Sequence, residues 1–446
     1  MATIRLPRGP KGHWLLGHMA AFRDDPLGLF TRSARDYGDF VPLRFGPARL
    51  ILISNPDDIE YVLITNNRNF VKDVAVRAIR PIGGNGLFLS EGDFWLRQRR
   101  LMQPAFHRQR IASYAETMVA YTQRMLDSWQ GGETRDVHHE MTHLTMTIVA
   151  KTLFDADVGN EAAELGATIT RALECLSARL GSLWLLLPDT LPLPMNVRMR
   201  REVRRLDEVV YRIIDQRRAS GEDRGDLLSM LLHTQDEDDG SRMTDLQVRD
   251  EAMTLFLAGH ETTATTLAWA WYLLSQHPEA EARLVAEVQA ALAGRAATVE
   301  DLQRLHYAEM VVTETLRLYP PVMALGREPI ADCQIGGYPV RKGTSLIMSP
   351  WVLQRDPRYF EEPARFEPDR WADGLAQRLP RFAYFPFGGG PRLCIGSAFA
   401  TMEATLVLAT VAQRYRLRLA PGQIVVPAVT PTLRPKHGLK MVVEAR

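Results

Sequence analysis

Apolar residues recur with a period close to 3.6 along most of the chain, which is the pattern of helices that bury one face. The segments with this pattern are 15–22, 114–129, 138–154, 203–220, 245–277 and 304–319. Fewer segments carry the alternation or the β-branched runs that are typical of strands. These segments are 40–45, 49–55, 334–349 and 440–446. The pattern predicts a mainly α protein with a minor β region.

The longest helical segment is apolar on nearly every face from Asp250 to His277. Such a helix crosses either a protein core or a membrane. His260, Glu261 and four neighbouring threonines lie at its centre, and these polar groups would be costly in lipid. We therefore expect this helix to pass through the core of a water-soluble protein.

The charge balance excludes some classes of protein. The 446 residues contain 54 Lys and Arg and 53 Asp and Glu, which gives a formal net charge of +1. A balanced chain lacks the overall basic charge that nucleic-acid binding favours, and it has no acidic tail. We expect no nucleic-acid partner. The length by itself favours two or three domains, although no linker or internal repeat clearly divides the chain.

The three cysteines do not form a framework. Cys175, Cys333 and Cys394 are odd in number, far apart and never in C-x-x-C spacing, so they predict neither disulfides nor a zinc site. The N-terminal stretch lacks the apolar run and the small-residue cleavage site of a secretory signal. We expect a cytoplasmic protein without a membrane anchor.

Cys394 stands out because of its neighbours in FPFGGGPRLCIG, residues 385–396. A lone cysteine is usually a small buried hydrophobe. Here three glycines permit a tight turn around the sulfur. The apolar run after Gly396 predicts a helix whose N-terminal amides would stabilise a thiolate. A phosphate loop is a competing interpretation, but no Gly-Lys-Ser/Thr follows the glycines. The pattern favours a cysteine that binds a metal.

A second candidate site lies in the long apolar helix, at AGHETT, residues 258–263. His260 and Glu261 are similar to a zinc-protease helix, but the second histidine would fall on Ala264. The small residues and the threonines also suit a helix-packing site. Packing does not explain an acid beside the hydroxyl of Thr262, because a buried carboxylate costs free energy unless it is paired or protonated. Such a pair can relay protons into a dry pocket.

A third candidate is the pair Glu314 and Arg317, which lie one turn apart on a helix that ends at Pro320. Most such pairs are solvated and contribute under about 1 kcal/mol. Met310 lies on the same stripe of the helix, which favours burial. A buried pair needs further partners, and the arginines in PARFEPDRW, residues 363–371, are candidates.

Together these stretches resemble the cytochrome P450 superfamily of haem-thiolate monooxygenases. The cysteine-loop pattern Phe-x-x-Gly-x-Arg-x-Cys-x-Gly is met without a departure by Phe387, Gly390, Arg392, Cys394 and Gly396. Further family motifs are matched by Glu314-x-x-Arg317, EPDRW with Arg370, AGHETT, and the Trp-x-x-x-Arg of Trp95 and Arg99. The resemblance covers essentially the whole chain. It replaces the expectation of several domains with one haem domain, residues 1–446, and no fused reductase.

The resemblance implies how the cofactor is held. Cys394 would be the axial thiolate of haem b, and Phe387 would belong to the same cofactor-binding loop. The residues that would hold the haem propionates are Trp95, Arg99, Arg327 and Arg392. The alternative for Arg327 is an ordinary surface arginine.

The resemblance also implies two further groups of residues. Thr262 would hold dioxygen and a water molecule, while Glu261 would help to supply protons. Glu314, Arg317 and Arg370 would form a buried structural network whose loss also loses the haem.

By analogy with the family, the substrate pocket is apolar. The expected lining residues are Phe256, Ala258, Val322, Met323, Leu325 and Val429, and the alternative for each of them is plain core packing. The expected substrates are O2 and a hydrophobic small molecule, in particular a fatty acid or a terpenoid.

Electrons are expected from separate proteins, because no flavin or nicotinamide-binding region follows the cysteine loop. A ferredoxin or flavodoxin with a NAD(P)H-dependent reductase would supply them. Five arginines expected near Cys394 would attract an acidic carrier, and a merely solvated basic face is the alternative. They are Arg97, Arg100, Arg108, Arg110 and Arg392.

Three other functions stay open at this point. A peroxide-driven peroxygenase or decarboxylase would use the same fold, but relatives of that kind typically replace the acid-alcohol pair. A non-catalytic haem sensor would use the thiolate only as an anchor and would not need that pair. A zinc hydrolase based on His260 and Glu261 would need a third ligand that the sequence does not reveal.

Overall fold

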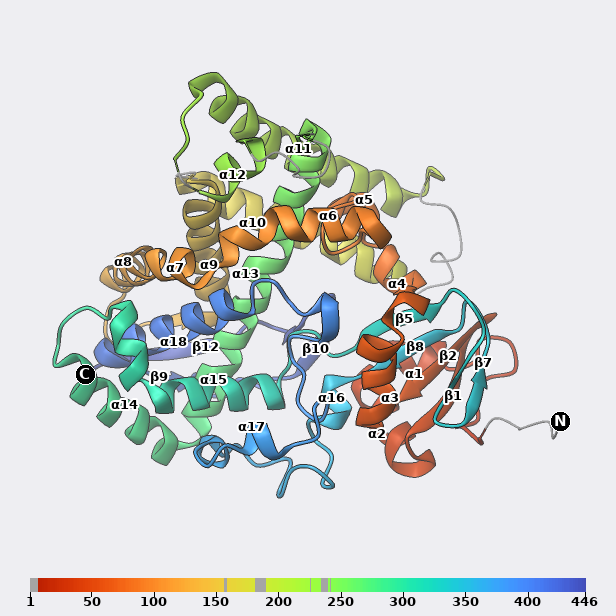
Figure 1. The fold of residues 1–446 in the computed structure, drawn as a ribbon. Coiled ribbons are helices and arrows are strands. Elements are labelled where there is room, and N and C mark those ends of the chain that lie inside the picture. The colour runs from red at the N-terminus through yellow and green to blue at the C-terminus, as the bar shows by residue number, and fades with distance from the viewer. Residues whose placement is uncertain (1–6, 156–158, 181–189, 225, 234–239, 241) are drawn as a thin grey trace.

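Helices form most of the molecule, and a small sheet lies at one side near the N-terminus (Figure 1). The computed structural model describes residues 7–155, 159–180, 190–224, 226–233, 240 and 242–446. The helices are α1 (Met19–Asp24), α2 (Pro26–Tyr37), α3 (Pro56–Glu60), α4 (Val74–Arg77), α5 (Arg80–Gly83), α6 (Gly92–Met102), α7 (Arg108–Ser113), α8 (Ala115–Asp127), α9 (Val137–Phe154), α10 (Gly159–Leu180), α11 (Pro194–Ser220), α12 (Leu227–His233), α13 (Asp245–Gln276), α14 (Pro278–Leu292), α15 (His306–Leu318), α16 (Pro350–Leu353), α17 (Leu375–Arg378) and α18 (Ser397–Arg414). The mainly α prediction is confirmed.

The strands are short and fall into separate sheets. They are β1 (Phe40–Phe45), β2 (Ala48–Ile53), β3 (Phe70–Lys72), β4 (Thr134–Asp136), β5 (Leu325–Pro329), β6 (Cys333–Ile335), β7 (Tyr338–Val340), β8 (Ser345–Met348), β9 (Tyr415–Leu419), β10 (Pro427–Val429), β11 (Leu433–Pro435) and β12 (Lys440–Ala445). The largest sheet has the order β1-β2-β8-β5-β3, in which β2 and β8 run parallel and the other neighbours are antiparallel. Its register places Lys72 opposite Arg327.

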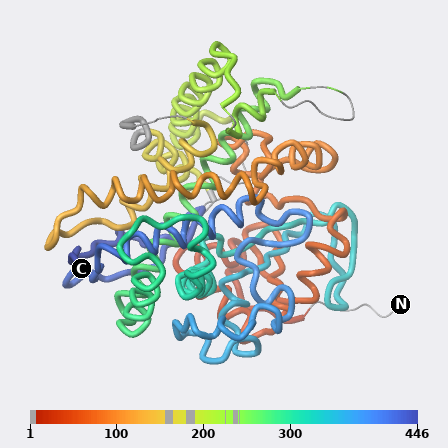
Figure 2. The backbone as a smooth tube through the Cα atoms, turned by 60° about the vertical axis from the view of Figure 1, so that its left-hand side comes forward, coloured from red at the N-terminus to blue at the C-terminus, as the bar shows by residue number. Residues whose placement is uncertain are grey.

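The helix α13 forms the centre of the helical body. Thr244 caps its N-terminus in a capping box with Gln247, and the helix ends just before Pro278. It packs against α9, α11, α15 and α18, and Figures 1 and 2 show it running through the middle of the helices. Trp269 is fully buried, stacks on Tyr319 with ring centroids 4.0 Å apart, and donates its Nε1–H to Leu433 O at 2.7 Å. The apolar segment 250–277 is therefore a core helix.

The helix predicted over 15–22 is wrong in its first turn. The structure has a turn closed by paired backbone hydrogen bonds between His13 and Gly17, and α1 begins only at Met19. The amides of Leu15 and Leu16 donate to His13 Nδ1, which provides the partner that a helix would otherwise supply. Among the helices of the described ranges, none is both long enough and apolar enough to cross a membrane.

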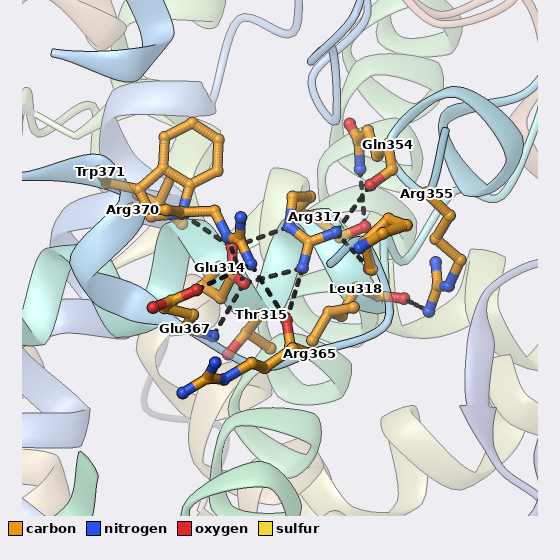
Figure 3. Close-up of polar contacts among 12 residues, drawn as sticks. Glu314, Thr315, Arg317, Leu318, Gln354, Arg355, Arg365, Glu367, Arg370 and Trp371 are labelled. Atoms are coloured by element: carbon orange, nitrogen blue, oxygen red, sulfur yellow. Dashed lines mark hydrogen bonds and ion pairs between the residues drawn. The ribbon is translucent and has the colours of Figure 1, made fainter. Parts of the chain in front are cut away.

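A buried ion pair connects α15 to the segments that precede the cysteine loop (residues 386–396). Glu314 and Arg317 have no exposed side-chain surface. Arg317 donates from Nε and Nη2 to the two carboxylate oxygens of Glu314, each at 2.8 Å. Arg370 and Trp371, on the 3₁₀ turn η6 (Pro368–Trp371), donate to the same carboxylate at 2.9 Å. Figure 3 shows these side chains converging on Glu314.

The remaining donors of Arg317 hold three other backbone segments. They reach the carbonyl oxygens of Gln354, Pro363 and Arg365 at distances from 2.7 to 2.9 Å. The Gln354 side chain in turn accepts the backbone N–H of Phe385 at 3.1 Å. The network therefore fixes the residues that lead into the cysteine loop.

We expect Glu314→Gln to destabilise the protein by about 3–5 kcal/mol, because it leaves two buried guanidinium groups without their carboxylate. Urea unfolding followed by circular dichroism measures the change. The matched control is Glu362→Gln, since Glu362 and Arg365 form an exposed pair at the same i,i+3 spacing. That substitution should cost less than about 1 kcal/mol. Equal effects of the two substitutions would show that the buried pair does not hold the fold.

Candidate active site

A cavity of about 700 Å³ lies between the middle of α13 and the cysteine loop. Its walls come from distant parts of the chain, from Met19 near the N-terminus to Pro431 before β11. Thr262 lines it from α13, and Cys394 lines it from the cysteine loop. The lining is mainly apolar, which suits a hydrophobic ligand held by a few polar groups.

The backbone of the cysteine loop brings the sulfur of Cys394 to this cavity. The N–H of Cys394 donates to Phe387 O at 3.0 Å, and the N–H of Leu393 donates to Gly390 O at 3.0 Å. Gly390 has a φ of 66°, and a Cβ at this position would lie 2.1 Å from Leu63 O. Only glycine fits here. The close approach of the loop to the neighbouring chain thus explains one glycine of the motif.

Two opposing effects act on the Cys394 thiol. Burial raises its pKa, while the Gly396 amide and the Arg99 guanidinium act in the opposite direction. Arg99 also donates to Leu393 O at 2.9 Å, next to the cysteine. The N-terminus of α18 therefore favours the thiolate as the sequence suggests, but burial is the larger effect. A bound metal cation would stabilise the thiolate further.

Besides Arg23, which is exposed and pairs with Asp24, four cationic side chains line the same cavity. They are Lys72, Arg99, Arg327 and Arg392. Burial lowers the pKa of Lys72 well below its usual value, and the charges of Arg327 and Arg392 lower it further. Burial likewise lowers the pKa of Arg392 to about 10. Burial removes these cations from water, which costs free energy. An anionic partner in the cavity would offset that cost.

The protein itself balances only part of this charge. In the described part of the chain, the carboxylates that raise the pKa of Lys72 are Glu91 and Asp73. Arg392 pairs with Glu91, donates to Ser90 O at 2.8 Å, and lies 3.9 Å from the centroid of the Trp95 ring. Four cations thus stand against two carboxylates. A ligand that carries two negative charges would balance them.

The residues present fit a haem group. Haem combines an apolar disc, two carboxylates at one edge and a central iron. The cavity offers an apolar lining, a cluster of four cations and a cysteine sulfur on its wall. The alternative of an ordinary surface arginine is excluded for Arg327, because its side chain is buried in β5 and lines the cavity.

The acid and the alcohol of AGHETT occupy different surroundings. Thr262 lines the cavity and donates its hydroxyl to Ala258 O at 2.7 Å. Glu261 is buried and is not among the lining residues, and its Oε1 accepts the hydroxyl of Thr432 at 2.8 Å. Thr432 belongs to the turn between β10 and β11, whose other residues line the cavity. The carboxylate therefore joins α13 to this hairpin.

Five of the six expected pocket residues line the cavity. They are Ala258, Val322, Met323, Leu325 and Val429. Phe256 departs from the expectation, because its fully buried ring stacks on Phe154 with centroids 4.4 Å apart. It lies on a face of α13 that packs against α9, so its position is corrected to the helical core.

Sequence reasoning missed Lys72 and Thr432. Lys72 ends a short strand, and the only local signal is a lysine in an otherwise apolar run, FVK. Its role depends on the pairing of β3 with β5, which brings it opposite Arg327. Thr432 carries no signal, because its contact with Glu261 joins residues 171 positions apart.

The zinc interpretation of His260 and Glu261 finds no support. His260 is buried, and its Nδ1 contacts the carbonyl oxygen of Phe256 one turn earlier in the helix. Across the described residues, no three or more His, Cys, Asp or Glu side chains are grouped so that they would hold a metal ion.

Comparison with known proteins agrees with this geometry. The family model described as Cytochrome P450 matches residues 7–442. The chain is 40% identical to cyclooctatin synthase of Streptomyces melanosporofaciens over 98% of this chain and 95% of the relative. It is 39% identical to cyclooctat-9-en-7-ol 5-monooxygenase of the same organism, over 92% and 88%. It is 35% identical to pentalenene oxygenase of Streptomyces avermitilis, over 97% and 96%.

The match extends over nearly the whole chain and includes the cysteine loop, the α13 motif and the Glu314–Arg317 pair. The resemblance seen in the sequence is therefore confirmed. The chain belongs to the cytochrome P450 family and is a haem-thiolate monooxygenase.

Proposed function

We propose that the protein inserts one oxygen atom of O2 into a terpenoid, with electrons from separate carrier proteins. The observation that carries the proposal is the mainly apolar cavity of about 700 Å³ that Cys394 and Thr262 both line. The names of the three relatives refer to terpenoids. A bulky hydrophobic molecule gains most from such a lining, because burial of apolar surface provides the main driving force for binding.

The chain's own residues would hold the cofactor at two places. Cys394 would bind the haem iron through its sulfur, and Phe387 would support the loop that carries it. The propionates would be held by Lys72, Arg99, Arg327 and Arg392, with Trp95 beneath Arg392. When bound, haem supplies the activation of O2 and the transfer of one oxygen atom to the substrate.

Thr262 and Glu261 would manage protons at the edge of the cavity. The Thr262 hydroxyl donates to a backbone carbonyl, and its Oγ1 can still accept a hydrogen bond from water. It can therefore hold a water molecule beside the substrate. The Glu261 carboxylate accepts from Thr432 outside the lining, so it would deliver protons after a rotation or through water.

Exposed basic residues near the cysteine loop support an acidic redox partner. A surface groove is lined by Arg100 and Arg110 together with His107, and Arg108 is exposed beside it. Such a face attracts an acidic ferredoxin or flavodoxin, which a NAD(P)H-dependent reductase would reload. Arg392 does not belong to this face, because its side chain is only 16% exposed and lines the cavity.

Residues 1–446 would act as one haem domain. The cavity takes its walls from both halves of the chain, which supports this reading. Cys175, Cys333 and Cys394 are all free of disulfides. Free thiols suit the reducing cytoplasm that the sequence favours.

Cyclic terpenes should bind to the purified haem protein and shift its Soret band to the high-spin position. With ferredoxin, reductase and NADPH, the product should contain one oxygen atom from isotopically labelled O2. Palmitate is the control for the fatty-acid alternative. Tighter binding and turnover of palmitate would contradict the terpenoid proposal. Efficient turnover on hydrogen peroxide alone would favour a peroxygenase, and the absence of any product would favour a haem sensor.

Cys394→Ala should abolish the strongly red-shifted Soret band that the reduced wild type gives with carbon monoxide, because the thiolate is lost. The matched control is Cys333→Ala, a free cysteine in β6 that is not among the cavity-lining residues. This control should keep the band. A wild type with a histidine-type band that Cys394→Ala leaves unchanged would refute thiolate ligation by Cys394.

Thr262→Val should reduce the product formed per NADPH consumed by at least about tenfold, because a positioned proton-transfer group contributes at least that much. The side chain keeps its shape but loses the hydroxyl. Thr262→Ser restores the hydroxyl and should recover most of the coupling. A Thr262→Val enzyme that stays fully coupled would remove Thr262 from the proton path.

A further inference from the structure

Residues 84–91, here called the distal loop, join α5 to α6 and lie directly on α13. Leu87 and Phe88 of this loop line the cavity. The loop has little secondary structure of its own. Two of its backbone amides instead donate hydrogen bonds to consecutive acids of α13, Asp250 and Glu251. Asp250 Oδ2 accepts the N–H of Asn85 at 2.7 Å, and Glu251 Oε2 accepts the N–H of Leu87 at 2.8 Å.

Two glycines allow the loop to approach so closely. A Cβ on Gly84 would lie 2.0 Å from the Asp250 carboxylate, and a Cβ on Gly86 would lie 2.3 Å from Thr254 Oγ1 and 2.4 Å from Asp250 O. The loop therefore lies directly against Asp250 and Thr254 of the helix, and at Gly86 it reaches the helix backbone. Its position depends on the two carboxylates that receive its amides.

Glu251 is the more deeply buried of the two acids. Its side chain has no exposed surface, and its second oxygen accepts Gln98 Nε2 from α6 at 2.8 Å. One carboxyl group therefore links α13, the distal loop and α6. The same loop ends in Ser90 and Glu91, which contact Arg392 of the cation cluster.

We propose that Glu251 is the positioning residue that anchors the distal loop on α13 and so sets the shape of the cavity wall that Leu87 and Phe88 form. The inference rests on the proposed function, because it assigns this wall to the substrate. Glu251 itself does not line the cavity, so it acts on the substrate only through the loop.

The protonation state of Glu251 then controls the loop. Burial raises the pKa of Glu251 to about 7, the charge of Asp250 raises it, and the bonds from Leu87 and Gln98 lower it. When the loop opens, water reaches the carboxyl and its pKa falls toward the usual value. The closed loop therefore binds the proton more tightly than the open loop. By linkage, the closed state has its full stability below about pH 4.5, the usual pKa of a glutamate, and loses stability as the pH rises from there to about 7, above which the pH has no further effect.

The neighbouring charges do not remove this effect. On α13 the adjacent groups are Asp250 and Arg249, and Arg249 also pairs with Asp207 on α11. On α6, Arg97 contacts Gln98, the residue that donates to Glu251. The loop contributes amides and no ionisable group to Glu251.

Amide hydrogen exchange of the holoenzyme tests the anchor. In the wild type, exchange of the distal-loop peptide should accelerate between about pH 4.5 and pH 7 by up to tenfold per pH unit beyond the intrinsic rate, and this extra acceleration should level off above about pH 7. Glu251→Gln can accept from Leu87 and donate to Gln98 Oε1 without a charge, so its loop should stay protected at every pH. Glu251→Met lacks the acceptor and should exchange faster at every pH. Glu279→Gln, on the exposed start of α14, should match the wild type.

A second variant keeps the test decisive if Glu251→Met does not fold. Gln98→Met removes one bond that lowers the pKa of Glu251, so the midpoint of the pH effect should move upward. A loop whose exchange, relative to the intrinsic rate, is equal in the wild type and Glu251→Gln at all pH values would overturn the proposal. A Gln98→Met midpoint at or below that of the wild type would overturn it too.

The shape of the wall is tested by the binding affinity of 4-phenylimidazole, whose imidazole ring binds haem iron and whose phenyl ring extends into the cavity. Imidazole, which lacks the phenyl ring, is the control. In the wild type, the affinity for neutral 4-phenylimidazole relative to neutral imidazole should fall several-fold between about pH 4.5 and pH 7, and in Glu251→Gln it should stay constant. A constant ratio in both proteins would refute the role of Glu251 at the wall. A protein in which neither azole shifts the Soret band would refute the proposed haem function instead, and loop exchange would still test the anchor.

Discussion

The buried ion pair between Glu314 and Arg317 is the constraint on which the rest of the site depends. Two charges without solvent exposure are tolerated only if every donor and acceptor around them is used. Arg317 meets this demand by binding the carbonyl oxygens of Gln354, Pro363 and Arg365. Three segments that have little regular structure are thereby held to one helix. The Gln354 side chain in turn accepts the backbone N–H of Phe385, directly before the cysteine loop, and so fixes that residue as well.

A second group of buried charges behaves differently because the protein does not complete it. Around Glu314 each cation meets a carboxylate or a carbonyl oxygen, so that network is stable without a ligand. Around the cavity, Lys72, Arg327 and Arg392 repel one another, and Glu91 and Asp73 offset only part of this repulsion, so an anionic ligand would relieve the rest. This contrast separates a network that holds the fold from a cluster that binds a cofactor. It also couples cofactor binding to stability, since a ligand that binds only the folded state stabilises that state.

The distal wall depends on a third kind of contact, in which carboxylates of the core helix hold a loop by its backbone amides. Asp250 and Glu251 do for the distal loop what Arg317 does for the segments before the cysteine. In both places a charged side chain on a rigid helix organises irregular backbone. The cavity lies between the two, so its shape depends on both sets of contacts as well as on the residues that α13 and α15 contribute to the lining.

The sequence by itself determined the features whose cause is local. The apolar period predicted α13, the spacing of Glu314 and Arg317 predicted a pair on one helix face, and the glycines before Cys394 predicted a tight turn. Five of the six expected pocket residues also line the cavity. Phe256 was misplaced because periodicity does not tell which face of an all-apolar helix meets a cavity and which meets α9.

Only the tertiary structure decided which distant groups meet. Lys72 joined the cation cluster through strand pairing, and Glu261 reached Thr432 across 171 positions of the chain. The anchors of the distal loop and of Arg317 are backbone amides and carbonyls, which every residue type carries. Such contacts leave no mark on the choice of amino acid at the backbone end. The sequence thus specified the charged side chains that need partners, and the folded chain supplied those partners from backbone that no motif identifies.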